Sequence, residues 1–168
     1  LFTTHALLYT EMVTSAALEH GDANYLLKHH VSEHPVALQL GGSNPKELAK
    51  AAELGEEACF DEINLNVGCP SDRVKAGKFG ASLMADPQIV SNCVSAIKQS
   101  TRLPVTVKCR IGVDDKDTHA DLVNFINVVA TGGCELFVIH ARKAYLQGLS
   151  PKENREIPPL NYERVFAV

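Results

Sequence analysis

The sequence lacks a long apolar run and a recognisable leader. It has no stretch of about eighteen consecutive apolar residues. A basic segment followed by an apolar core and a small-residue cleavage site is also absent. These absences argue against a membrane span and a secretory signal in this chain, and we expect a soluble, cytoplasmic protein with no membrane partner and no evident protein partner. Because the first residue is leucine, we also expect the chain to be a piece of a longer protein.

An excess of positive charge is lacking too. Sixteen Lys and Arg residues stand against 20 Asp and Glu residues, which gives a formal net charge of -4. Such a chain has no global basic field to attract nucleic acid. Any binding of RNA or DNA must therefore depend on a local basic patch.

Paired cysteines are the third absence. The five cysteines are an odd number and show neither a C-x-x-C pair nor zinc-like spacing. We therefore expect free thiols, a reducing compartment and no metal site. Cys59, Cys93, Cys109 and Cys134 lie in apolar or helical surroundings and are expected to behave as small hydrophobes. Cys69 differs, because it stands between glycine and proline after a run of alternating amide and aliphatic residues.

What the sequence does contain is an alternation of short β-rich runs with helix-like segments. We predict strands at 7–12, 35–40, 61–67, 104–111 and 135–141, and helices at 13–24, 45–58, 86–101 and 118–132. This order predicts one α/β domain with a parallel sheet covered by helices. The polar, proline-bearing segment 143–159 is predicted to be a functional loop.

The predicted strands carry polar side chains on one face and aliphatic side chains on the other. Successive side chains of a strand point to opposite faces, and the polar rows are Gln39, then Glu62, Asn64 and Asn66, then Thr106, Lys108 and Arg110, then His140 and Arg142. A doubly wound sheet would give nearly continuous apolar strands. The pattern favours a (β/α)8 TIM barrel, with polar groups gathered at the carboxyl ends of the strands. The alternative is a set of satisfied interior polar groups.

The chain is short for a complete barrel. A barrel of this kind usually needs about 250 residues, whereas the chain has 168 and shows five predicted strands. We therefore expect an incomplete TIM barrel with about five of its eight strands, lacking one strand before Leu1 and two after Val168.

Six ordered blocks of the sequence resemble the tRNA-dihydrouridine synthases of the A type. The blocks are VALQLGG (36–42), EINLNVGCPSDRV (62–74), GKFGASLM (77–84), VTVKCRIGVDD (105–115), FVIHARKA (137–144) and LSPKENREIPPL (149–160). The resemblance implies an FMN-dependent barrel that reduces the C5–C6 double bond of uridines in the tRNA D-loop, with NADPH as reductant. It also implies that residues 1–168 are part of the catalytic barrel. The family's C-terminal helical RNA-binding domain, first-strand flavin motif and late glycine-rich phosphate loops are not found in this sequence.

The resemblance gives Cys69 the role of proton donor. Hydride from reduced flavin adds to C6 of the uracil, and C5 then needs a proton. A thiol with an ordinary pKa near 8.5 is mostly protonated at neutral pH and can act as this acid. Gly68 permits an abrupt turn, and Pro70 restricts Cys69 to extended conformations. The alternative is a buried cysteine at the end of a strand; a nucleophilic or metal-binding role is disfavoured because no histidine or second cysteine lies nearby in sequence.

Three further residues match FMN-contacting positions of the family, namely Gln39, Lys108 and His140. An amide can donate to and accept from the flavin edge, and a cation near that edge stabilises an anionic reduced flavin. Two alternatives remain open. Lys108 could pair with Glu62 inside the barrel, and His140 could be a satisfied core histidine.

Asn66, Lys152 and Arg155 match tRNA-contacting positions of the family, and Arg142, Lys143, Arg73, Lys75 and Lys78 could extend a basic rim. A solvated charged surface is the alternative for these last five. Cys109 and Ser82 stand where many bacterial members carry His and Cys, which hints at a plant, algal or cyanobacterial lineage and leaves an organelle possible. Two other functions stay open: an FMN-barrel oxidoreductase acting on a small pyrimidine, and a non-catalytic truncated fragment.

Overall fold

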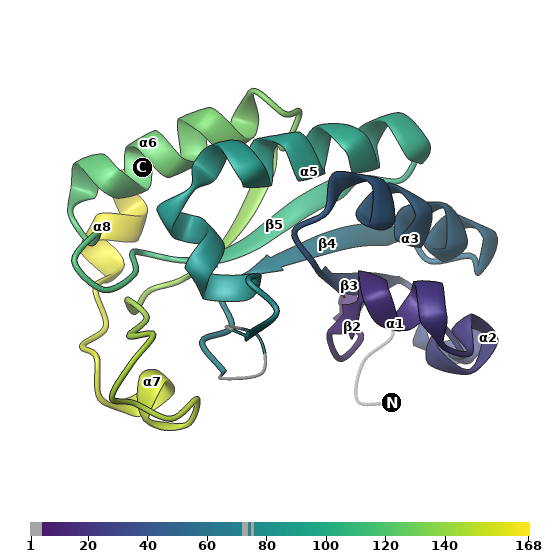
Figure 1. Cartoon of the computed structure of the whole chain (residues 1–168), viewed down its shortest axis with the longest axis horizontal. Helices are drawn as coiled ribbons and strands as arrows, with labels where there is room; N and C mark the ends of the chain where they lie inside the picture. The colour runs from purple at the N-terminus through teal and green to yellow at the C-terminus, as the bar shows by residue number, and fades with distance from the viewer. Residues whose placement is uncertain (1–4, 72–73, 75) are drawn as a thin grey trace.

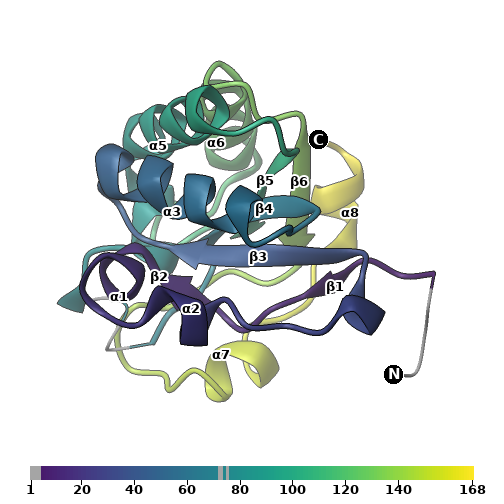
Figure 2. The same cartoon turned by 90° about the vertical axis from the view of Figure 1, so that its right-hand side faces the viewer.

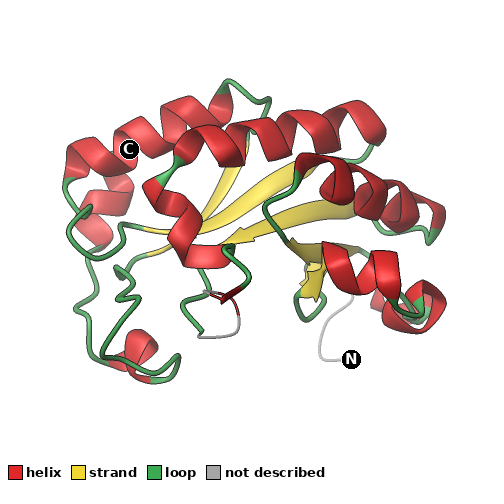
Figure 3. Ribbon diagram, in the orientation of Figure 1, coloured by secondary structure: helices red, strands yellow, loops and turns green. Residues whose placement is uncertain are grey.

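A computed structural model describes residues 5–71, 74 and 76–168 (Figure 1). Parallel strands alternate with helices along the chain, and Figure 3 shows the helices packed over the strands. The strands are β1 (Leu8–Tyr9), β2 (Val13–Thr14), β3 (Val36–Gly41), β4 (Glu62–Val67), β5 (Val105–Arg110) and β6 (Leu136–His140). The α-helices are α1 (Ser15–His20), α2 (Ala23–Leu26), α3 (Pro45–Glu57), α5 (Pro87–Ser100), α6 (His119–Ala130), α7 (Glu153–Glu156) and α8 (Tyr162–Phe166), and the 3-10 helices are η1 (Val31–Glu33) and η2 (Gly80–Ala85).

The sheet has the order β1-β3-β4-β5-β6, and all its pairings are parallel. β2 pairs with β3 as well, so β1 and β2 share one edge of the sheet. Helices α3, α5 and α6 cover one face, whereas α7 lies on the other side of the strands (Figure 2). Five parallel strand positions with helices on one face confirm the prediction of an α/β fold with about five strands of a TIM barrel.

The amino-terminal elements differ from their prediction. The strand predicted at 7–12 is shortened to β1, because the Thr10 hydroxyl, and not a backbone carbonyl, accepts the Gln39 N–H at 3.0 Å. The helix predicted at 13–24 begins later, since Val13 and Thr14 pair with β3, and it ends at Gly21 before α2. The segment predicted to be a loop at 143–159 contains the one-turn helix α7.

The other predicted helices are confirmed to within two residues at each end, and their caps explain why. Asn44 accepts the N–H of Lys46 at the start of α3, and Asp86 accepts that of Ile89 at the start of α5. Proline occupies the first turn of both helices. No helix of the described residues is long and apolar enough to cross a membrane.

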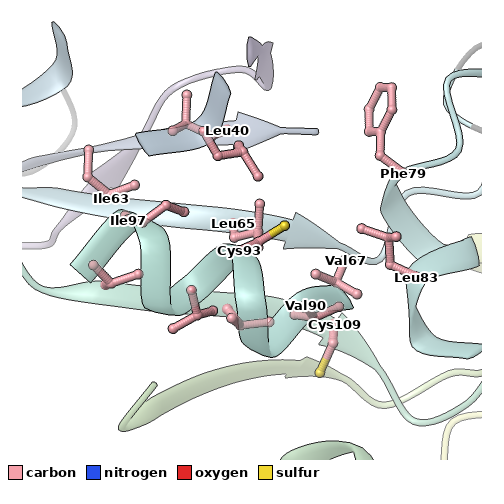
Figure 4. Close-up of a cluster of buried hydrophobic side chains, with 14 of the residues drawn as sticks. Leu40, Ile63, Leu65, Val67, Phe79, Leu83, Val90, Cys93, Ile97 and Cys109 are labelled. Carbon is pink, nitrogen blue, oxygen red and sulfur yellow. The ribbon is translucent and has the colours of Figure 1, made fainter. Parts of the chain in front are cut away.

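The hydrophobic core lies between the sheet and the helices, as Figure 4 shows for one part of it. The aliphatic faces of the central strands are buried there, as the alternation predicted, together with side chains of α3, α5 and α6. The fully buried members include Leu38, Leu40, Ile63, Leu65, Val67, Val107, Leu48, Val90, Val94, Ile97 and Phe125. The opposite face of each central strand is thereby left to the polar side chains.

The cysteines follow their prediction with one exception. Cys93, Cys109 and Cys134 are buried, and burial raises the pKa of Cys93 and Cys109 to about 12 and that of Cys134 to about 11. Cys59 was predicted to act as a small buried hydrophobe, and this was wrong. It follows the end of α3 with a φ of 66°, a left-handed conformation that turns it to the surface.

Candidate active site at the carboxyl ends of the strands

A chain of hydrogen bonds joins the polar side chains of β3, β4 and β5. The Thr106 hydroxyl donates to Glu62 Oε1 at 2.6 Å and accepts from Asn64 Nδ2 at 2.8 Å. Asn64 Oδ1 accepts from Gln39 Nε2 at 2.9 Å, and Gln39 Oε1 accepts from Asn66 Nδ2 at 2.8 Å. Because the Thr106 hydroxyl donates its hydrogen to Glu62 Oε1, its oxygen accepts from Asn64 Nδ2, and this orientation of the Asn64 amide sets the direction of the bonds that follow.

The chain of bonds ends at the backbone of Cys69. Asn66 Oδ1 accepts the N–H of Gly68 at 3.1 Å and that of Cys69 at 3.0 Å. The Cys69 carbonyl accepts the N–H of Ala81 at 2.9 Å, and its Sγ donates to Ser71 Oγ at 3.6 Å. The thiol is half-buried and belongs to the second residue after the end of β4. Both the backbone N–H and the backbone carbonyl of Cys69 are therefore held by hydrogen bonds.

Arg110 is a member of this site to which the sequence analysis gave no role. It lies on the polar face at the end of β5 and is 4% exposed. Its Nε donates to the carbonyl of Gly68 at 3.1 Å, and its Nη1 donates to the carbonyls of Asn154 at 2.8 Å and Lys143 at 3.4 Å. One guanidinium thus joins the loop of Cys69 to the segment 143–159. The signal was present in the sequence, as an inward-facing arginine at a predicted strand end.

Asn154 was also missed, although it lies in the quoted block LSPKENREIPPL. Its side chain is fully buried. Asn154 Oδ1 accepts the N–H of Tyr145 at 2.8 Å, while Nδ2 donates to the carbonyls of Tyr145, Leu149 and Ser150 at 3.0, 3.2 and 3.3 Å. This one amide folds the segment back on itself. Sequence alone does not predict that an asparagine in a polar loop is buried and organises the loop.

Lys108 faces the same side of the sheet as Arg110 and does not pair with Glu62. Glu62 instead accepts hydrogen bonds from Thr106 and from the Tyr9 hydroxyl, the latter at 3.2 Å. Burial is the main cause that lowers the pKa of Lys108, and the charge of Arg110 adds to it. Among the ion pairs of the described residues none involves Lys108, so its ammonium keeps donors for a ligand.

His140 ends β6 beside Arg110, with which it pairs in register. Burial lowers its pKa to about 4, and the charges of Arg110, Lys108, Arg142 and Arg155 act in the same direction. The imidazole is therefore neutral at pH 7, with one N–H donor and one acceptor. Within the part of the chain that the structure describes, no hydrogen bond engages this half-buried ring, which sets it apart from a satisfied core histidine.

The residues predicted to contact tRNA lie at two places. Asn66 is engaged by Gln39 and by the loop of Cys69, as described above. Lys152 and Arg155 are exposed at the start and within the single turn of α7. The charge of Arg155 acts on both Arg110 and His140, so α7 brings at least this residue toward the strand ends.

The other basic residues of the predicted rim have mixed positions. Arg142 Nη1 donates to the carbonyl of Pro158. Lys143 forms an ion pair with Asp117 at 2.9 Å, which also raises the pKa of the lysine. Both are engaged within the chain, whereas Lys78 is exposed. The remaining two, Arg73 and Lys75, lie outside the described residues.

Comparison with known proteins decides the family. The profile of the family described as dihydrouridine synthase (Dus) matches residues 1–168. The chain belongs to the dihydrouridine synthase family. The resemblance carried by the six sequence blocks is thereby confirmed.

Curated relatives of this Dus chain share one name. The tRNA-dihydrouridine(20/20a) synthase of Shewanella oneidensis is 61% identical over 166 residues, which are 99% of this chain and 49% of the relative. The protein of the same name from Vibrio parahaemolyticus is 60% identical over 167 residues, 99% of this chain and 51% of the relative. The protein of this name from Synechocystis sp. is 59% identical over 164 residues, which are 98% of this chain and 49% of the relative. The chain spans about half the length of the curated relatives it matches.

Proposed function

We propose that this chain carries the proton-donating part of an enzyme that reduces specific uridines of the tRNA D-loop to 5,6-dihydrouridine, with NADPH as reductant. The observation that carries the proposal is the directed chain of hydrogen bonds from Glu62 to the backbone N–H of Cys69. The shared name of the relatives, tRNA-dihydrouridine(20/20a) synthase, supports positions 20 and 20a as the targets.

Cys69 is the proposed acid. Reduction of the C5–C6 bond adds a hydride at C6 and a proton at C5, so a group that can release a proton must face C5. The half-buried thiol is a free cysteine just past the end of β4, and Asn66 Oδ1 holds its backbone N–H. Loss of the proton leaves a thiolate beside Lys108 and Arg110, whose positive charges oppose the cost of that anion.

The polar face fits FMN as the hydride source. When bound, FMN supplies the hydride for C6, and NADPH returns it to the reduced state. Lys108 and His140 offer donors that no described residue engages, one cationic and one neutral. Gln39 is held in one orientation by Asn64 and Asn66, and its amide retains one further donor and one further acceptor site. We assign these three residues to the flavin.

Recognition of tRNA is assigned to Asn66, Lys152 and Arg155. A uridine must leave its base stack to reach a group at a strand end, and an extruded base is held by hydrogen bonds to its edge. Asn66 lies next to Cys69 and has one amide N–H left for this purpose. The exposed cations of α7 suit phosphate oxygens.

The test is the Cys69→Ala variant of the purified, FMN-loaded protein, assayed for dihydrouridine in a tRNA transcript with NADPH. Loss of the acid should lower product formation by about 10²- to 10⁴-fold, the usual contribution of general acid catalysis. Flavin absorbance should remain, because the thiol is not assigned to the cofactor. Cys59→Ala is the matched control, since Cys59 is an exposed thiol outside the site.

Two outcomes would count against the proposal. Normal turnover by Cys69→Ala would remove the cysteine from the mechanism. Reduction of free uracil, with no reaction on tRNA, would assign the site to a small pyrimidine instead.

A further inference from the structure

Two histidines face each other at the amino ends of the strands, and Cys69 lies at the opposite, carboxyl ends. His34 precedes β3, and His29 lies in the segment that follows α2. Their Nε2 atoms are 3.3 Å apart, and their ring planes are inclined at 60°. Since β3 and β4 are parallel, this pair lies at the amino ends of the strands, away from the site at their carboxyl ends.

The second nitrogen of each ring has a partner that can only accept. His29 Nδ1 lies 3.0 Å from the carbonyl oxygen of Leu27. His34 Nδ1 lies 2.7 Å from Asp61 Oδ2, an oxygen that also accepts the N–H of Val36 at 2.7 Å. Each Nδ1 must therefore carry the proton of the neutral ring, which leaves a lone pair on each Nε2. Two lone pairs 3.3 Å apart repel unless a cation lies between them.

The surrounding residues hold both rings in this arrangement. His29 packs on Phe60, with ring centroids 4.3 Å apart and planes inclined at 36°. Asp61 Oδ2 is fixed behind the His34 ring, because it accepts from both His34 Nδ1 and the Val36 N–H. A carboxyl oxygen thus stands behind one ring and a backbone carbonyl oxygen behind the other.

We propose that His29 and His34 form a two-histidine site for a divalent transition-metal ion of the class that imidazole prefers, with Zn²⁺ as the first candidate. A tetrahedral zinc ion with Zn–N bonds of about 2.0–2.1 Å places two ligand nitrogens about 3.3–3.4 Å apart, and the observed separation is 3.3 Å. Metal-bound histidines almost always donate their other N–H to a carboxylate or a backbone carbonyl. Asp61 and Leu27 supply one of each.

Water completes the coordination of this site. Within the described residues, no group of three or more His, Cys, Asp or Glu side chains is placed to hold a metal. Both histidines are half-buried, so solvent has access to the remaining coordination positions. With two protein ligands, the site binds zinc more weakly than a structural site with four. It suits an exchangeable ion, and it is independent of the chemistry proposed for Cys69.

The experiment is a calorimetric titration of the purified protein with ZnCl₂ at pH 7.5. We expect one zinc ion whose binding is at least tenfold weaker in His29→Gln and in His34→Gln. His20→Gln is the matched control, because this exposed histidine lies in α1 outside the pair, and it should bind zinc as the unaltered protein does. Asp61→Asn keeps an acceptor oxygen but removes the charge, and should weaken binding by about 10- to 100-fold.

Nitrogen chemical shifts of the two imidazoles decide between a metal and a proton. With zinc bound, both rings should remain protonated at Nδ1, and both Nε2 resonances should shift as zinc is added. A single proton shared between the two Nε2 atoms, with shifts unchanged by an excess of zinc, would overturn the proposal. This measurement uses the unaltered protein, so it remains decisive even if a histidine variant fails to fold.

Discussion

Asn66 Oδ1 accepts the backbone N–H of Cys69 at 3.0 Å, so a side chain within a strand fixes the residue that follows the strand. Asn66 can present this oxygen only because its Nδ2 is occupied by Gln39. The orientation of Gln39 depends in turn on Asn64, whose own amide is set by Thr106 and the carboxylate of Glu62. The position of Cys69 is therefore coupled to the buried carboxyl group of Glu62 at the start of the same strand.

Thr106→Val tests this coupling. The substitution keeps the shape of the side chain but removes the donor to Glu62 and the acceptor for Asn64. Leaving buried polar groups without partners should lower the free energy of unfolding by about 1–3 kcal/mol. Urea denaturation measures this loss. Thr106→Ser is the control, because it keeps the hydroxyl that donates to Glu62 and accepts from Asn64, so its variant should lose less stability than Thr106→Val. Equal effects of the two substitutions would show that the chain of bonds adds no stability.

Arg110→Met tests the connection between the loop of Cys69 and the segment 143–159. The variant removes the guanidinium donors to the carbonyls of Gly68 and Asn154, and we expect a loss of about 3 kcal/mol in the free energy of unfolding. Faster amide exchange should be concentrated in 143–159. Arg102→Met is the control, since Arg102 pairs with Glu56 at the surface and should leave exchange in this segment unchanged. Uniformly faster exchange across the whole chain would contradict the assigned role.

The sequence predicted the central elements because their signals are local and agree with one another. In β4, the alternation of Glu62, Asn64 and Asn66 with aliphatic residues requires one polar and one buried face, and the structure has both. Caps such as Asn44 and Asp86 likewise mark the helix starts. The roles of Arg110 and Asn154 could not be predicted in this way. Arg110 contacts residues 33 to 44 positions away, which no local pattern encodes. The Asn154 side chain contacts residues 4 to 9 positions away, but it does so in a segment without a periodic pattern.

The lowered pKa of His140 predicts how the stability of the fold depends on pH. Its pKa in the folded protein is about 4, below its ordinary value near 6.5. The unfolded chain therefore binds more protons at this residue between these values, and stability falls as the pH falls through the window from about 6.5 to about 4. His140→Gln should make stability less dependent on pH in that window, measured by urea denaturation at a series of pH values. His119→Gln, at the exposed start of α6, should retain the original dependence. An NMR titration of His140 with a midpoint above pH 6 would contradict the assigned environment.

Substitutions of Gly80 and Gly148 distinguish backbone strain from a steric clash of the added Cβ atom. Both have a left-handed conformation, with φ of 65° and 81°, so alanine at either position carries a backbone cost of about 1–2 kcal/mol. A Cβ at Gly148 meets nothing within 4 Å, whereas one at Gly80 would lie 2.6 Å from the carbonyl oxygen of Cys69 and 2.3 Å from Val74 Cγ1. Gly80→Ala must therefore displace the loop of Cys69 as well as strain its own backbone. We expect Gly148→Ala to lower the melting temperature with little change in dihydrouridine formation, and Gly80→Ala to lower both. Full activity of Gly80→Ala would show that the reaction tolerates a shift of the Cys69 carbonyl, and the close fit between η2 and that loop would then have no part in placing the thiol.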